Sequence, residues 1–412
     1  MSVPLSSATL LPMTRHDALV REPTCQGKPG SIDARRNKSG DHMNGQWMGK
    51  YSATNAAGDM VIEVDDLGDC FAGCAYAYPA DARIPHAVGY FKTVDKKRNS
   101  TTRAEFMPID PRRGEIAPWP TIANQYPGAT FASDAKVELK WTNSTLSLKW
   151  STNINTAGTA ELSKSDAGKP SEYVSDRMEW DEFKRYVGEL DYRRYIFRGQ
   201  KRPWRLRTNY HRTGRADLAR YLAEDIPSLH RHLSARTRHL FDRRNPDENG
   251  AFLHMVQHHG YPTPLLDWTY SPFVAAFFAY RGIGNSEAEK AKDSDHVRIF
   301  QFDRTRWVKS FNQVQKLTPA MPHFSVMEFV AVDNERMIPQ QALSGLTNVD
   351  DVESYIRSKE QPDNPYLKVI DIPWRGRARI MRDLSTMGIT SGSLFPGLDG
   401  TCEEMRERFF SS

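Results

Sequence analysis

One arginine stands at the end of a short apolar segment, immediately before a glycine. Residues 195–200, with the sequence YIFRGQ, have the composition of a strand that ends in Arg198, Gly199 and Gln200. A guanidinium binds a phosphate or a carboxylate through two parallel hydrogen bonds, and glycine lets a ligand approach the backbone. Arg198 is therefore a candidate anion-binding residue. The alternative is an arginine that pairs with a nearby acid and only stabilises the fold.

A second set of polar residues lies between two expected helices, within residues 257–273. His258 and His259 end the first helix, and a short apolar strand after them carries Asp267 and Thr269. Adjacent histidines on a helix point roughly 100° apart. Because no third ligand is suitably spaced, we expect no metal site here.

The carboxylate of Asp267 is unusual for its apolar neighbours. Leu265, Leu266 and Trp268 flank it in the sequence. Apolar surroundings raise the pKa of a carboxyl group unless a partner such as Arg198 stabilises its charge. Asp267 either takes part in chemistry or forms a buried pair with Arg198 that only fixes the fold, and the sequence leaves both interpretations open.

The region around Arg198 is strongly basic. Residues 193–215 contain nine Lys or Arg residues and no acid, and aromatic side chains lie between them. Such a pattern binds single-stranded nucleic acid, and it also suits the pyrophosphate and adenine of a dinucleotide. A solvated basic face is the third interpretation. The lack of acids near Arg198 favours an anionic ligand, with Arg205 and Tyr210 as further contacts.

Two polar runs nearer the C-terminus, residues 334–341 and 388–400, indicate no reaction by themselves. Together with the two earlier motifs, however, they resemble the FRG domain family, which is named for its Phe-Arg-Gly motif, here residues 197–199. All four motifs occur in the family's order, and the likeness covers roughly residues 176–410. The sequence departs from the family pattern at three positions, which are Pro264, Ala342 and Ser344.

The resemblance implies an ADP-ribosyltransferase-like α+β fold and an activity on NAD. In that scheme Arg198 binds the phosphates or ribose of NAD, Thr269 supplies a hydroxyl, and Gln340 faces the nicotinamide ribose. Breaking the bond between nicotinamide and ribose builds an oxocarbenium-like centre, which oriented polar groups stabilise. Glutamine is neutral and stabilises positive charge less well than a carboxylate does. Three carboxylates could act in its place: Asp267, Glu328 and Glu335.

The resemblance further implies transfer of ADP-ribose to a macromolecular target, or cleavage of NAD, and by analogy a role in anti-phage defence or as a toxin. The alternative is a non-catalytic module that binds a nucleotide or nucleic acid in the same basic cleft. The residues expected to contact NAD are Arg198, Gly199, Gln200, Arg205, Tyr210, His258 and Trp268.

The elements that position these residues divide the chain into parts. Within residues 45–163 polar and apolar residues alternate with a period of two, and about eight short strands favour an antiparallel barrel or sandwich. This module could hold a ligand, bind a partner and so choose the target, or merely pack. We expect residues 1–44 to be a disordered tail and residues 164–175 a linker. The FRG-like domain then spans residues 176–412.

The composition excludes several classes of protein. With 412 residues and 39% hydrophobic residues, the chain is neither fibrous nor disordered throughout. A net charge of +5 is mild, so an electrostatic partner must be recognised by a local patch. No apolar run approaches the ~20 residues that span a bilayer. Four scattered cysteines are too few to stabilise a chain of this length through disulfide bonds. We therefore expect reduced thiols in a cytoplasmic protein.

Overall fold

The structure, a computed structural model, describes residues 42–315, 317 and 321–410. The expected disordered tail, residues 1–44, lies outside the described residues except for its last three. Of these, Met43 is buried, and its carbonyl accepts a hydrogen bond of 2.8 Å from the Trp47 indole. The described residues form one compact unit.

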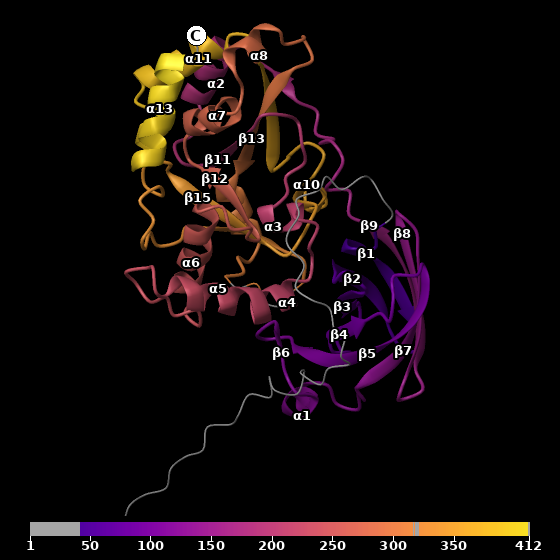
Figure 1. Cartoon of the computed structure of the whole chain (residues 1–412). Coiled ribbons are helices and arrows are strands. Elements are labelled where there is room, and N and C mark those ends of the chain that lie inside the picture. Colours follow the sequence, from indigo (N-terminus) through magenta and orange to yellow (C-terminus); the bar gives the residue numbers. More distant parts are fainter. Residues whose placement is uncertain (1–41, 316, 318–320, 411–412) are drawn as a thin grey trace, which may run out of the picture. The chain divides into compact units, whose positions relative to one another are not determined.

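Eight antiparallel strands close into a barrel in the first half of this unit (Figure 1). They are β1 (Gly45–Ala53), β2 (Ala57–Asp66), β3 (Phe71–Pro79), β4 (Ala87–Lys92), β5 (Asn99–Asp110), β7 (Asp134–Trp141), β8 (Thr145–Thr152) and β9 (Ala157–Lys164). Closure follows because β1 pairs with both β2 and β9, while β4 pairs with β5. The alternation of the sequence thus produces a closed barrel, the first of the two expected architectures.

The inner face of the barrel is apolar. On the hairpin of β7 and β8, Leu139 lies opposite Leu148, and both side chains are buried. Together with Phe91, Phe106 and Trp150 they line a cavity of about 180 Å³. The short strand β6 (Glu115–Ile116) and the helical turns α1 (Trp119–Ile122) and η2 (Ala123–Gln125) follow β5.

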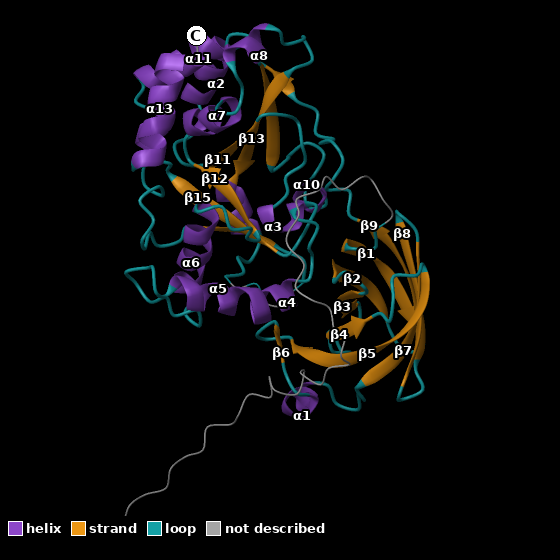
Figure 2. Cartoon of the chain, viewed as in Figure 1, coloured by secondary structure: helices purple, strands orange, loops and turns teal. Residues whose placement is uncertain are grey.

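The second half is built on a mixed seven-stranded sheet in the order β10-β16-β13-β11-β12-β15-β14 (Figure 2). Its strands are β10 (Asp176–Arg177), β11 (Tyr195–Gln200), β12 (Leu265–Thr269), β13 (His296–Asp303), β14 (Phe324–Met327), β15 (Ala342–Thr347) and β16 (Leu367–Pro373). All neighbours are antiparallel except β10 and β16. The strands β11 and β12 are adjacent, with Phe197 opposite Thr269. Two motifs separated by about seventy residues of sequence therefore meet at the centre of the sheet.

Helices cover both faces of this sheet. One cluster of buried side chains joins Phe197 and Val297 to Trp180, Phe183 and Phe277 on the helices. The helices of this region are α2 (Trp180–Gly188), α7 (Pro272–Tyr280), α8 (Asn285–Glu289), α11 (Arg377–Thr386), α12 (Ser391–Leu394) and α13 (Leu398–Phe410). The alternation along β11 follows from this packing, because Phe197 contributes to one face and Ile196 to the other.

The opposite face packs against α9 (Arg304–Ser310) and α10 (Val352–Arg357), and Trp307 and Ile356 lie in the same cluster as Ile196. A further cluster joins Leu265 and Leu346 to α3 (Asn209–Arg212), α4 (Leu218–Arg220), the π-helical turn η3 (Tyr221–Asp225), α5 (Ile226–Leu233) and α6 (Pro246–His258). The α+β class expected from the sequence is confirmed.

Buried acids on the barrel strand β2 bind the segment that leads into α4. Asp65 Oδ1 accepts hydrogen bonds from the main-chain nitrogens of Ala216 and Asp217, and Glu63 Oε2 accepts one from Leu218. The segment expected to be a linker, residues 164–175, is also held in place, because Glu172 pairs with Arg205 at 2.5 Å.

Candidate functional site

A pocket of about 210 Å³ brings together four residues that the sequence singled out: Arg198, Asp267, Thr269 and Gln340. The adjacent strands β11 and β12 supply the first three, and the turn before β15 supplies Gln340. Gly199 and Trp268 also contribute to the lining, as does Ala342, one of the three departures from the family pattern. The convergence expected of distant motifs is therefore present in the structure.

Arg198 has one buried donor without a hydrogen-bond partner in the described part of the chain. Its Nη1 donates a hydrogen bond of 2.6 Å to the main-chain oxygen of Asp267, not to the carboxylate. Its buried Nε has no partner among the described residues. Burial lowers the pKa of Arg198 to about 10, against the raising effect of the Asp267 charge, so the side chain stays cationic at neutral pH. The buried pair between the two side chains, one of the two interpretations that the sequence left open, is not formed.

A chain of hydrogen bonds fixes the carboxylate of Asp267. The Thr263 hydroxyl donates to the Gln257 side-chain oxygen, and the Gln257 amide nitrogen donates to Asp267 Oδ1. Because Gln257 and Thr263 are buried, they hold the carboxylate rigidly at the pocket wall.

Thr269 and Gln340 use their polar groups within the domain. The Thr269 hydroxyl donates to the main-chain oxygen of Gln340 at 2.7 Å and accepts from the Ser271 nitrogen at 3.0 Å. The Gln340 amide nitrogen donates to the Leu394 oxygen at 2.9 Å. Ser271 in turn caps α7, since its hydroxyl accepts from the Val274 nitrogen at 3.2 Å. In this arrangement the two side chains join β12, the turn before β15 and α12.

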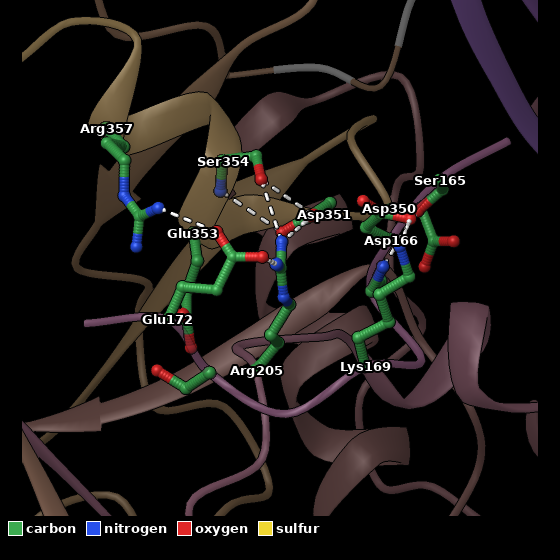
Figure 3. Close-up of polar contacts among 12 residues, drawn as sticks. Ser165, Asp166, Lys169, Glu172, Arg205, Asp350, Asp351, Glu353, Ser354 and Arg357 are labelled. Atoms are coloured by element: carbon green, nitrogen blue, oxygen red, sulfur yellow. Dashed lines mark hydrogen bonds and ion pairs between the residues drawn. The ribbon is translucent and has the colours of Figure 1, made fainter. Parts of the chain in front are cut away.

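Arg205, expected to contact NAD, belongs to an internal ion-pair network and not to the pocket (Figure 3). Its guanidinium is only 3% exposed and lies among Asp351, Ser354 and Glu172, at 2.5, 2.9 and 2.5 Å. The expectation was wrong because acids far away in the sequence complete its hydrogen bonds. Such a paired, buried arginine stabilises the fold, and each of its three guanidinium nitrogens already donates to a group of the protein.

The basic run as a whole is largely neutralised. Within residues 193–215, all described by the structure, seven of the nine basic side chains lie within 4.0 Å of a carboxylate. The two exceptions are Arg198 and Arg212. Arg212 donates to Gln200 Oε1 and to the main-chain oxygen of Arg207. Arg198 is thus the pocket's own unpaired cation among the described residues.

Three other residues expected to contact NAD make hydrogen bonds or ring contacts within the domain. Tyr210 is buried, and its hydroxyl donates to the Asp217 main-chain oxygen at 2.9 Å. Gln200 donates to the Trp204 oxygen at 2.8 Å. Trp268 packs against Phe302 in the core, so its ring is not available for stacking on a base. Within the basic run, Phe197 and Tyr210 are buried and reflect packing inside the domain, whereas Trp204 is 48% exposed.

His258 lies beside a histidine that the sequence argument did not consider. Its Nδ1 contacts Asn334 Oδ1 at 2.8 Å, and its ring centroid is 4.4 Å from that of His254. Burial and the neighbouring His258 lower the pKa of His254 to about 4. His259, the other member of the pair considered before, is exposed. The signal that could have found His254 is its spacing of four residues from His258, which places both on one helix face.

The fold and the pocket define an α+β domain whose central strand presents an unpaired arginine beside a fixed carboxylate. Residues 193–288 match the sequence model described as the FRG domain. The chain therefore carries an FRG domain, and the matched residues include the first two of the four motifs. The motifs at residues 334–341 and 388–400 lie outside the match. A search of curated proteins found no match. Among the described helices, none combines the length and apolar character needed to cross a membrane.

Proposed function

We propose that the pocket around Arg198 binds the anionic part of a nucleotide, and that the FRG domain is an ADP-ribosyltransferase-like enzyme acting on NAD. The observation that carries this proposal is the state of Arg198, a cation with a buried, unpartnered Nε at the wall of a pocket. Leaving a buried donor without a hydrogen bond costs about 1–3 kcal/mol, and more for a charged group. A phosphate or a ribose hydroxyl would satisfy that donor.

The size of the pocket limits how much of the ligand it encloses. Its 210 Å³ is below the ~300–1,000 Å³ of sites that enclose a whole small molecule. It suits one ring and its attached group, such as the nicotinamide-bearing ribose of NAD with its phosphate, which would place the phosphate at Arg198. The remainder of the dinucleotide would lie outside the pocket, where a macromolecular target could reach the bond that breaks.

Asp267 is the group best placed to act on the developing charge. When the bond between nicotinamide and ribose breaks, nicotinamide leaves with the bonding electron pair, and the ribose carbon becomes positively charged. A carboxylate held by Gln257 stabilises that charge without having to reorganise. Water, or a nucleophile of the target, then adds to the carbon and loses its proton. Gln340 is less suited to this role, because its amide donates to Leu394.

The alternative is a module that binds a nucleotide or nucleic acid without turnover. The pairing of seven basic side chains with carboxylates favours a small anion over a long nucleic acid, since few unpaired charges remain to meet a phosphate backbone. An activity that consumes NAD damages the cell that contains it, which fits a role as a toxin or in anti-phage defence. In this scheme the barrel contributes to the choice of target.

The test is turnover of NAD by the purified full-length protein. With NAD labelled separately in nicotinamide and in adenosine, we expect free nicotinamide and either ADP-ribose or a labelled target. Asp267→Asn should lower the rate at least tenfold. The matched control is Arg212→Gln, which removes the other arginine of residues 193–215 without a carboxylate partner but does not alter the pocket lining. Binding of NAD without consumption would favour the non-catalytic alternative, and equal rates for wild type and Asp267→Asn would contradict the role of Asp267.

A further inference from the structure

We propose that His254, His258 and Asp267 form a binding site for a divalent transition-metal ion, with zinc as the reference ion. The proposal goes beyond the action on NAD and does not depend on it. One ligand atom from each of the three side chains lies within 4.8 Å of the other two. Two imidazoles and one carboxylate are the ligand set that several catalytic zinc sites use.

The local structure explains how the three groups come together. His254 and His258 are four residues apart on α6 and therefore project from the same face of the helix. Asp267 follows on β12, which packs next to that helix after the turn at residues 259–264. Ligand atoms about 2.0–2.2 Å from a tetrahedral zinc are about 3.3 Å apart, so small side-chain rotations would complete the site.

His254 provides an independent reason to expect a ligand. Its side chain is only 1% exposed, yet neither Nδ1 nor Nε2 has a hydrogen-bond partner among the described residues. Buried polar atoms are nearly always paired, because an unpaired one costs the free energy of its desolvation. A metal ion bound to one of the two nitrogens would account for a buried imidazole at this place.

Hydrogen bonds from residues outside the metal site orient the other two ligands, as in known metal sites. The oxygen of the Asn334 side chain accepts only, so its contact of 2.8 Å requires the proton of His258 on Nδ1. This leaves the lone pair of Nε2 for a metal. Similarly, Gln257 donates to Oδ1 of Asp267 and leaves Oδ2 for the metal. Asn334 belongs to the polar run of residues 334–341, which would thus help to orient a metal ligand.

The location of the site connects it with the pocket. Asp267 belongs both to this cluster and to the wall that Arg198 lines. An ion held by three protein ligands keeps at least one coordination position for water or substrate. Its positive charge would add to that of Arg198 and strengthen the attraction of the pocket for an anion. With the ion bound, the Asp267 carboxylate would be less able to stabilise the positive charge that develops on the ribose when NAD is cleaved.

The experiment measures metal content and not activity, so its outcome is independent of NAD turnover. Full-length protein is stripped with a chelator, incubated with zinc, passed over a desalting column and analysed for zinc by mass spectrometry. We expect one zinc per chain in the wild type, and at least a tenfold weaker affinity after His254→Ala or His258→Ala. The matched control is His259→Ala, an exposed neighbour that should keep full stoichiometry.

A second measurement covers the case in which the alanine variants unfold. Cobalt added to the stripped wild type should produce the visible absorption of a site of low coordination number, and zinc should abolish it. Zinc should also raise the melting temperature of the wild type and of His259→Ala. A wild type that retains no zinc and shows no cobalt absorption would overturn the proposal, as would equal loss of zinc in His259→Ala.

Discussion

Gly199 on β11 lies against the main chain of Ala275 on α7, so closely that a methyl group added to Gly199 would fall 1.8 Å from the Ala275 carbonyl oxygen. The glycine of the Phe-Arg-Gly motif is therefore required for helix packing against the strand, and not primarily for the approach of a ligand. Because α7 begins directly after β12, this contact also fixes the relative position of Arg198 and Asp267.

Gly199→Ala should therefore destabilise the domain. The methyl group meets main-chain atoms that cannot rotate away, and overpacking of this kind costs typically 1–3 kcal/mol. Urea unfolding followed by circular dichroism measures the loss. Gly188→Ala is the control, because nothing lies within 4 Å of a methyl group at that position of α2. Equal stability of Gly199→Ala and the wild type would contradict the close packing.

Arg198→Ala and Arg205→Ala should differ sharply in stability. Arg198→Ala removes only a hydrogen bond to a main-chain oxygen, so we expect the free energy of unfolding to fall by about 1 kcal/mol. Arg205→Ala leaves Asp351 and its network without their cation, and breaking a buried pair costs about 3–5 kcal/mol. Thermal and urea unfolding of the two variants distinguish the roles. A larger loss for Arg198→Ala than for Arg205→Ala would show that Arg198 is a structural residue.

Salt should affect ligand binding only weakly. Since Arg198 is the unpaired cation of the pocket among the described residues, affinity for a nucleotide should fall by about one power of salt concentration or less. Calorimetric titrations at several salt concentrations, with NAD and with a single-stranded oligonucleotide, provide the slope. A steep slope, together with tighter binding of the oligonucleotide, would instead support nucleic-acid binding by the basic run.

Stability should depend on pH through Glu63, which binds the start of α4. Burial, followed by the charge of Asp217, raises the pKa of Glu63 well above its ordinary value of 4.5. A raised pKa in the folded state means that the stabilising contribution is complete below about pH 4.5 and is lost as the pH rises through the folded value. Glu63→Gln should therefore flatten the decline in unfolding free energy above pH 4.5.

The control for this pH dependence is Glu161→Gln on the exposed face of β9. Urea unfolding at closely spaced pH values should give the same profile for this variant as for the wild type. If Glu63→Gln also follows the wild-type profile, its carboxyl group does not titrate as proposed.

Local patterns sufficed to predict that residues 45–163 form about eight antiparallel strands, and to predict the strands and helices that carry the first two motifs. Alternation along β7 and β8 reports a buried face directly, as Leu139 and Leu148 show. Similarly, Arg198 and Asp267 could be assigned to one pocket, because each lies in a recognisable motif on a short strand. These predictions depend on periodicity and on residues close together in the sequence.

The partners of charged residues could not be predicted in the same way. Arg205 looked available because its stretch contains no acid, but Asp351 reaches it from 146 residues away. For the same reason the apolar flanks of Asp267 suggested a pair with Arg198, whereas Gln257 holds its carboxylate. Such contacts are set by the packing of the sheet and its helices, which no local pattern reports.

Calorimetric titration of NAD into full-length protein tests the central claim most directly, namely that Arg198 binds an anionic nucleotide in this pocket. We predict saturable binding by the wild type and by Arg212→Ala, and a loss of at least tenfold in affinity for Arg198→Ala with its melting temperature nearly unchanged. Undiminished NAD affinity in a folded Arg198→Ala protein would contradict the account.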